Sequence, residues 1–137
     1  MKSYTDLDQS KKLAKILPLE SADMEYLAIK ENGALVGTVP FVKDDSEVED
    51  SAYSHTYDRI ACWSLSALLQ VLPLGIYDEF DNCDYELEID MIDKMPRYIR
   101  LGDIYHSKFP YDFEKDTLLD NIVESIIWLN DNNYFEL

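Results

Sequence analysis

Residues 61–73 read Ala-Cys-Trp-Ser-Leu-Ser-Ala-Leu-Leu-Gln-Val-Leu-Pro, and this stretch decides the fold. Ser64 is a good N-cap, because its hydroxyl can accept a hydrogen bond from a free backbone N–H of the following turn. Pro73 cannot continue a helix, and it disfavours helical geometry in the residue before it. Between them, leucines recur at helical spacing, at Leu65, Leu68, Leu69 and Leu72. The stretch therefore predicts a helix of about two turns with one leucine face.

A helix this short is not stable alone in water, so its leucine face must pack on another element. A β-sheet is the natural surface for it. Trp63, one residue before the cap, is placed to pack the start of the helix against the core. We therefore interpret the helix as a core element. The alternative, an exposed helix that binds in the groove of a partner, stays open at this point.

Another helix is predicted near the N-terminus. Thr5 and Asp8 resemble a capping box, with Thr5 as the cap and Asp8 in place of the usual Glu or Gln. The helix would run from Asp6 to about Leu17 and stop at Pro18, because proline removes a backbone donor and clashes with the preceding turn.

A β-hairpin is predicted between the two helices. Residues Met24–Lys30 alternate as a strand, and Ala34–Val39 would be the return strand, ended by Pro40. Asn32 and Gly33 lie between them, and both tolerate the positive φ of a tight hairpin turn.

The clearest strand pattern follows the central helix, at Tyr85–Ile92. Apolar residues alternate there with Glu86, Glu88 and Asp90, so one face is buried and the other is wet, as in antiparallel sheets. After a turn at 93–96, Arg97–Leu101 would return as the partner strand. A further strand is predicted at Ile104–Phe109.

The last element is a helix that opens at Asp112 or Asp116, with a wide apolar face at Leu119, Ile122, Val123, Ile126 and Leu129. The predicted order is α-β-β-α-β-β-α. We therefore predict an α+β protein, a single globular domain over residues 1–137, with an antiparallel sheet of two hairpins and helices packed on one face.

The composition indicates a folded and strongly acidic protein. In 137 residues, 47% are hydrophobic, the net charge is -16, and the pI is about 4.2. Such a chain should be repelled by nucleic acid and by anionic membranes. Cys62 and Cys83 are too few for a disulfide framework or a zinc motif, so free thiols and a cytoplasmic location are expected.

The acidic residues fall into two segments. Lys43–Arg59 has few apolar residues and many like charges, which predicts an acidic surface loop. Tyr53, His55 and Tyr57 alternate at its end, so a strand edge and loop residues that fold back over the central helix both stay open there. The other segment is Asp78–Asp90, which includes most of the strand predicted at Tyr85–Ile92. The candidate partner-binding residues are Asp44, Asp45, Glu47, Glu49, Asp50, Glu86, Glu88 and Asp90.

The motifs of common enzyme classes are absent from the sequence, including the Gly-rich phosphate loop and His-Glu-x-x-His. Cys62 and His55 could be paired as nucleophile and base, but Cys62 precedes a core helix and is better explained as a small buried hydrophobe. No catalytic residue, cofactor or metal is therefore assigned. One alternative stays open, a small metal-dependent enzyme that uses Glu86, Glu88 and Asp90.

Three segments of the chain carry a resemblance to a known family: Asp8–Leu13, Cys62–Pro73 and Ile122–Leu129. In this order and spacing the chain resembles a family of small uncharacterised proteins of Bacteroides-type bacteria and of bacteriophages or prophages, over nearly its whole length. The resemblance implies an accessory protein of a mobile element. The family has no assigned activity, so no functional residue is carried over, and the acidic loop Lys43–Arg59 departs from its pattern.

Taken together, these features predict a non-enzymatic acidic binding or adaptor protein of mobile-element origin that acts on a protein partner. Its surface charge would steer it toward a basic partner. The alternative is an immunity-type or DNA-mimic inhibitor of a basic nuclease or DNA-binding protein, since carboxylates can imitate a phosphate backbone.

Overall fold

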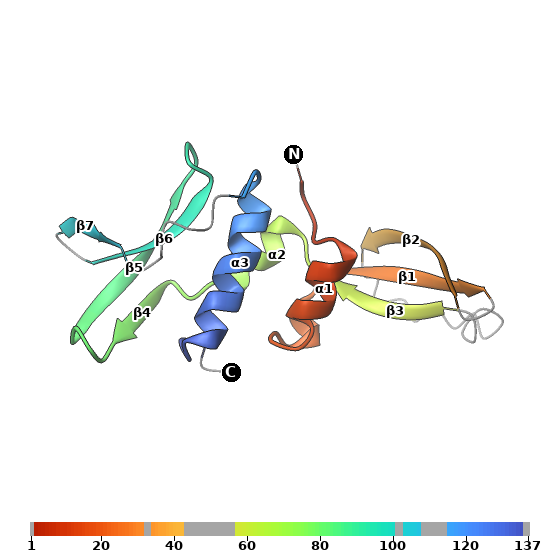
Figure 1. Ribbon diagram of the computed structural model, residues 1–137, viewed down its shortest axis with the longest axis horizontal. Helices are drawn as coiled ribbons and strands as arrows, with labels where there is room; N and C mark the ends of the chain where they lie inside the picture. Colours follow the sequence, from red (N-terminus) through yellow and green to blue (C-terminus); the bar gives the residue numbers. More distant parts are fainter. Residues whose placement is uncertain (1, 32–33, 43–56, 101–102, 108–114, 136–137) are drawn as a thin grey trace. The chain divides into compact units, whose positions relative to one another are not determined.

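The structure is a computed structural model that describes residues 2–31, 34–42, 57–100, 103–107 and 115–135 (Figure 1). The predicted α+β class with antiparallel strands is confirmed. Within the described residues, the strands form a three-stranded sheet in the order β2-β1-β3 and a four-stranded sheet in the order β4-β5-β6-β7. The two predicted hairpins thus belong to separate sheets and not to one. In addition, β3 pairs with β1 of the first hairpin, and β4 pairs with β5 of the second.

The chain divides into two compact units. The N-terminal unit spans Tyr4–Ala67. Its elements are α1 (Leu7–Leu13), the 3-10 turn η1 (Leu19–Ser21), β1 (Met24–Glu31), β2 (Ala34–Val42) and β3 (Tyr57–Cys62).

The C-terminal unit combines Met1–Ser3 with Leu68–Leu137. Its elements are β4 (Gly75–Asp78), β5 (Cys83–Asp90), β6 (Met95–Arg100), β7 (Asp103–Ser107) and α3 (Leu118–Asp131). The central helix α2 (Leu65–Val71) begins in the first unit and ends in the second.

The central helix forms as its sequence predicts. The Ser64 hydroxyl accepts a hydrogen bond from the backbone N–H of Ala67 at 3.1 Å and so caps the first turn. Leu68 and Leu72 are buried. Trp63 is fully buried, and its indole N–H donates to the Ser21 hydroxyl at 2.9 Å. The interpretation of this stretch as a core element therefore agrees with the burial of its apolar residues.

The first helix begins one residue later than predicted. Asp6, and not Thr5, is the N-cap, and its carboxylate accepts from the Gln9 backbone N–H at 2.8 Å while the Gln9 side chain accepts from the Asp6 N–H at 3.0 Å. Thr5 is instead fully buried, with its hydroxyl accepting from the backbone N–H of Trp63 at 3.1 Å. The regular helix also ends at Leu13, before the predicted Leu17.

In the N-terminal sheet, β2 runs through Pro40 to Val42 instead of ending there. Proline lacks a backbone donor, but it is tolerated on an edge strand, and β2 is an edge of this sheet. The last residues of the predicted loop Lys43–Arg59 were also misassigned, because Tyr57–Cys62 is strand β3. Residues 43–56 lie outside the described residues.

In the C-terminal unit, β5 and β6 pair as predicted, but the turn between them comes earlier than 93–96. The Asp90 carboxylate accepts from the backbone N–H groups of Ile92 and Asp93, which fixes the turn directly after Asp90. Lys94 has a φ of 55°, the left-handed conformation that closes it. Residues 75–78, for which no helix or strand was predicted, form strand β4.

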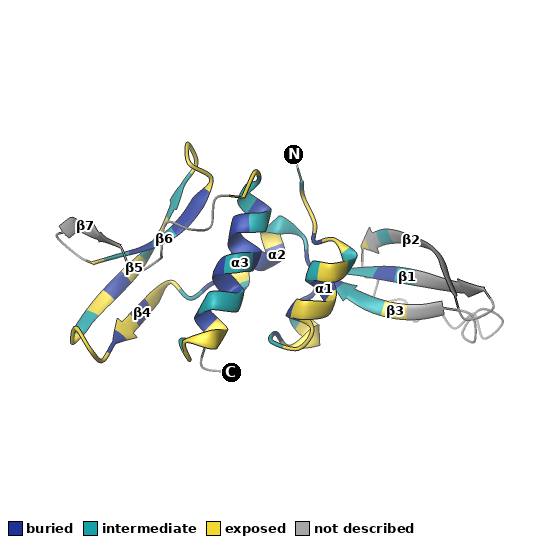
Figure 2. Cartoon of the chain, viewed as in Figure 1, coloured by how far each residue is buried: buried dark blue, intermediate teal, exposed yellow. Residues whose placement is uncertain are grey.

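Helix α3 packs on β6 and supplies much of the core of the C-terminal unit. Its N-cap is Thr117, whose hydroxyl accepts from the Asp120 N–H at 3.1 Å, so the predicted start at Asp116 was one residue early. Figure 2 shows the buried stripe along this helix. The stripe comprises the predicted apolar residues Leu119, Ile122, Val123, Ile126 and Leu129.

None of the helices in the described ranges has the length and apolar character to cross a bilayer.

Candidate functional site

An acidic groove lies in the C-terminal unit, along β4 and β5 and beside the segment that follows α3. It has a volume of about 1160 Å³. Three exposed carboxylates line it, those of Glu79, Asp84 and Glu86, and so do the aromatic residues Tyr77, Tyr134 and Phe135. We call this surface the acidic groove.

The pairing of β4 with β5 brings these residues together. Tyr77 pairs with Asp84, and Gly75 pairs with Glu86. Directly paired residues of an antiparallel ladder point to the same face, so Tyr77, Asp84 and Glu86 share one face of the hairpin. Gly75 opposite Glu86 adds no side chain, which leaves room beside that carboxylate. The groove therefore combines negative charge with an aromatic ring at its wall.

The charge of the groove is not balanced by ion pairs within the described residues. The cations that form ion pairs there are Lys2, which contacts Asp120, and Arg97, which contacts Asp90 and Asp93. Carboxylates and aromatic faces both attract an ammonium or guanidinium group. The groove can therefore hold a cationic side chain without displacing an existing ion pair of this part of the chain.

The structure separates the three strand carboxylates that the sequence grouped together. Glu86 lines the acidic groove. Glu88 is exposed on the same face of β5 but lies outside the groove lining. Asp90 is engaged in the turn, with Arg97 at 3.2 Å. Among the described residues, no group of three or more His, Cys, Asp or Glu side chains could hold a metal ion, so the metal-dependent alternative gains no support here.

The other five candidate residues, Asp44, Asp45, Glu47, Glu49 and Asp50, lie outside the described residues. Sequence reasoning missed Asp84 and Glu79 as members of the candidate site. The available signal was the acidic segment around them, but their convergence depends on β4, which was not predicted.

The pKa of Asp90 is lowered from its ordinary value of 3.8. The main cause is the hydrogen bond from the Asp93 backbone N–H at 3.1 Å, joined by the Ile92 N–H at 2.9 Å and the charge of Arg97. These contacts favour the ionised form of the carboxyl. Asp90 is thus a structural carboxylate of the turn between β5 and β6.

We expect Asp90→Asn to remove a pH-dependent part of the stability. Because the folded pKa of Asp90 is depressed, its contribution is present above the unfolded pKa of about 3.9 and is lost as the pH falls through the folded value. Urea denaturation of both proteins should therefore show a difference in unfolding free energy at pH 6 that shrinks toward pH 3. A difference that stayed constant over this range would mean that the charge of Asp90 has no role in the turn.

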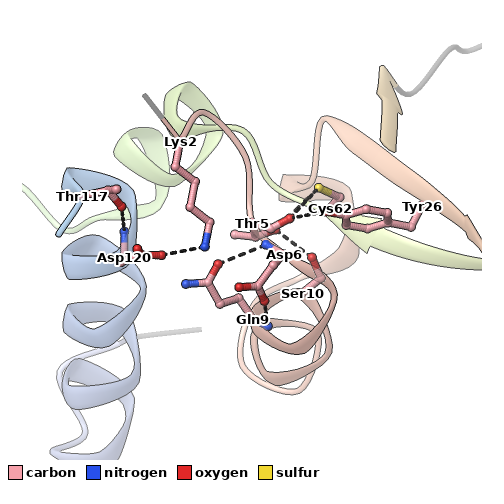
Figure 3. A network of polar contacts seen from close by, with 9 residues as sticks. All are labelled: Lys2, Thr5, Asp6, Gln9, Ser10, Tyr26, Cys62, Thr117 and Asp120. Carbon is pink, nitrogen blue, oxygen red and sulfur yellow. Dashed lines mark hydrogen bonds and ion pairs between the residues drawn. The ribbon is translucent and has the colours of Figure 1, made fainter. Parts of the chain in front are cut away.

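Cys62 is in a buried polar cluster of the N-terminal unit (Figure 3). Its Sγ lies 3.5 Å from the Thr5 hydroxyl, which is 2.7 Å from the Ser10 hydroxyl. Tyr26 donates its hydroxyl to the Thr5 carbonyl oxygen at 2.6 Å. Figure 3 shows these side chains gathered at Thr5, where they join α1 to β1 and β3.

Burial raises the pKa of the Cys62 thiol and that of the Tyr26 hydroxyl. Cys62 is 0% exposed. A nucleophilic cysteine requires an accessible thiolate, and a raised pKa disfavours that form. The cluster is therefore suited to fixing α1 on the sheet. His55, the base that could be paired with this thiol, lies outside the described residues.

No protein-family model, no curated protein and no solved structure matches this chain. The basis for assigning a function is therefore the groove together with the charge of the chain itself.

Proposed function

We propose that this protein is a non-enzymatic binding protein that holds a basic segment of a protein partner in its acidic groove. The observation that supports this proposal is the convergence of Glu79, Asp84 and Glu86 with Tyr77 and Tyr134 in one open groove. Net charge alone would only attract cations in general. A groove with an aromatic wall also offers contacts that depend on the shape of the partner.

The size of the groove favours a peptide segment. Its volume of about 1160 Å³ exceeds the roughly 300–1,000 Å³ of pockets for small ligands. Several side chains of an extended segment fit in such a space. The net charge of -16 steers a basic partner toward the protein, and the groove then holds one part of it.

Binding of a labelled peptide of eight arginines tests the proposal, with a peptide of eight glutamines as the neutral control. Replacing the groove carboxylates together, as Glu79→Gln, Asp84→Asn and Glu86→Gln, should weaken arginine-peptide binding at least about tenfold, or about 1.4 kcal/mol. Fluorescence anisotropy at about 0.15 M salt is the appropriate measurement, because a Debye length of about 8 Å screens distant charges.

The matched control removes the same number of charges elsewhere, as Asp8→Asn, Glu20→Gln and Glu88→Gln. These residues are exposed and do not line the groove. The control should retain binding within about twofold, a difference of about 0.4 kcal/mol. Equal losses in both variants would show that the peptide responds to net charge, and the acidic groove would then not be a binding site.

A further inference from the structure

A basic groove lies in the N-terminal unit, between the end of α1 and the strand β3. It has a volume of about 610 Å³. Lys11, Lys15 and Arg59 line it, and all three are exposed. Apolar residues complete the lining, among them Leu19, Met24 and Ile60.

The secondary structure explains why these cations meet. Lys11 and Lys15 are four residues apart, a spacing that places two side chains on one side of a helical turn. A backbone bond from the Leu17 N–H to the Leu13 carbonyl oxygen at 2.8 Å continues the turn beyond the regular end of α1. Arg59 is in β3, an edge strand of the sheet β2-β1-β3, and α1 contacts β3 (Figure 1). The cations therefore come from two elements.

The basic groove is an exception in an acidic chain. It brings together three of the chain's twelve basic residues, with Glu25 as the one carboxylate of its lining. Within the described residues, no ion pair involves Lys11, Lys15 or Arg59. In the pairing of β1 with β3, Glu25 is opposite Ala61 and Leu27 is opposite Arg59. Glu25 is therefore diagonal to Arg59 across the two strands. The net positive charge of the lining is available to an anion.

We propose that the basic groove binds a small phosphate monoester with an apolar body. A guanidinium matches the oxygens of a phosphate in a bidentate manner, and the lysines add point charges. Three cations against one carboxylate suit a ligand with close to two negative charges. The apolar residues can bury the organic part of the ligand, and the volume lies within the range of small-ligand pockets. This site is independent of the acidic groove.

Calorimetric titration of the full chain with phenyl phosphate tests this proposal. The salt concentration should be about 0.15 M, because the Debye length is then about 8 Å and the acidic chain repels anions less strongly. Phenyl phosphate should bind more tightly than inorganic phosphate, since the latter has no apolar body, and phenol should not bind. The double variant Lys15→Gln and Arg59→Gln should lower the affinity at least about tenfold. Glu25→Gln should raise it.

Lys12→Gln together with Lys115→Gln is the matched control, because it also removes two positive charges, and both lysines are exposed and do not line the groove. It should leave the affinity within about twofold. Thermal unfolding followed by circular dichroism verifies that each variant is folded. Equal losses in this control and in the double variant Lys15→Gln and Arg59→Gln would overturn the proposal. Equal affinity for phenyl phosphate and inorganic phosphate would also overturn it. Tighter binding of a peptide of eight glutamates would overturn it as well, and would identify the ligand as an acidic protein segment.

Discussion

Leu68→Asp is expected to abolish the native structure, whereas Leu69→Asp, one residue further along α2, should leave a folded protein of reduced stability. Leu68 is 0% exposed, while Leu69 is only partly buried. An isolated carboxylate without a partner costs many kcal/mol in an apolar interior. Domains of this size are stable by only about 5–15 kcal/mol. Far-ultraviolet circular dichroism and urea denaturation of both variants measure the effect.

Leu68→Met is the control for this comparison, because it keeps the volume and apolar character of the side chain. It should cost less than about 1.5 kcal/mol. If Leu68→Asp folded with the stability of the Leu69→Asp variant, the leucine face of α2 would be open to solvent. The helix would then again be a candidate for binding a partner.

The helices were predictable because their signals are local. The Ser64 cap, the leucine spacing and Pro73 all lie within one short stretch, and α2 forms there. The N-cap of α1 is Asp6 and not the predicted Thr5 because of a tertiary contact. Thr5 is buried with its hydroxyl bonded to Trp63 and Ser10, a demand that no local pattern reveals.

The strands β3 and β4 were missed because their pattern depends on distant partners. Asp58 and Arg59 look like a continuation of the charged loop, yet they pair with Ala28 and Leu27 of β1. β4 has four residues, too few for a clear alternation. Both grooves depend on these strands, since Arg59 comes from β3 and Tyr77 from β4. The charges could be read from the sequence, but their convergence could not.

Asn121→Asp should destabilise the C-terminal unit, and the loss should grow with pH. Asn121 is 1% exposed. Its amide Nδ2 donates to the carbonyl oxygens of Lys94 at 2.6 Å and of Lys115 at 3.3 Å, and its Oδ1 accepts from the Lys115 N–H at 3.0 Å. The side chain thus connects α3 to the left-handed residue Lys94 and to the segment before the helix. An aspartate would place a carboxylate oxygen against two carbonyl oxygens, at a cost of about 3 kcal/mol or more.

The pH dependence follows from the protonated form of the introduced carboxyl. In that form the side chain of the Asn121→Asp variant could still donate one hydrogen bond to the Lys94 carbonyl oxygen. Burial and the carbonyl groups should therefore raise its folded pKa above the unfolded value of about 3.9. The native state then binds more protons than the unfolded state between these two values, and stability falls as the pH rises. Urea denaturation from pH 4 to pH 8 should show a growing deficit relative to the parent protein.

Asn121→Ala provides the control, because it removes the same hydrogen bonds without adding an ionisable group. Its deficit should be about 1–3 kcal/mol and independent of pH relative to the parent protein. A pH-independent deficit in Asn121→Asp as well would contradict the assignment of the amide as the donor to Lys94. The groups that face position 121 at hydrogen-bond distance are backbone carbonyl and N–H groups, which do not titrate in this range, so a pH-dependent difference between the two variants would come from the introduced carboxyl itself.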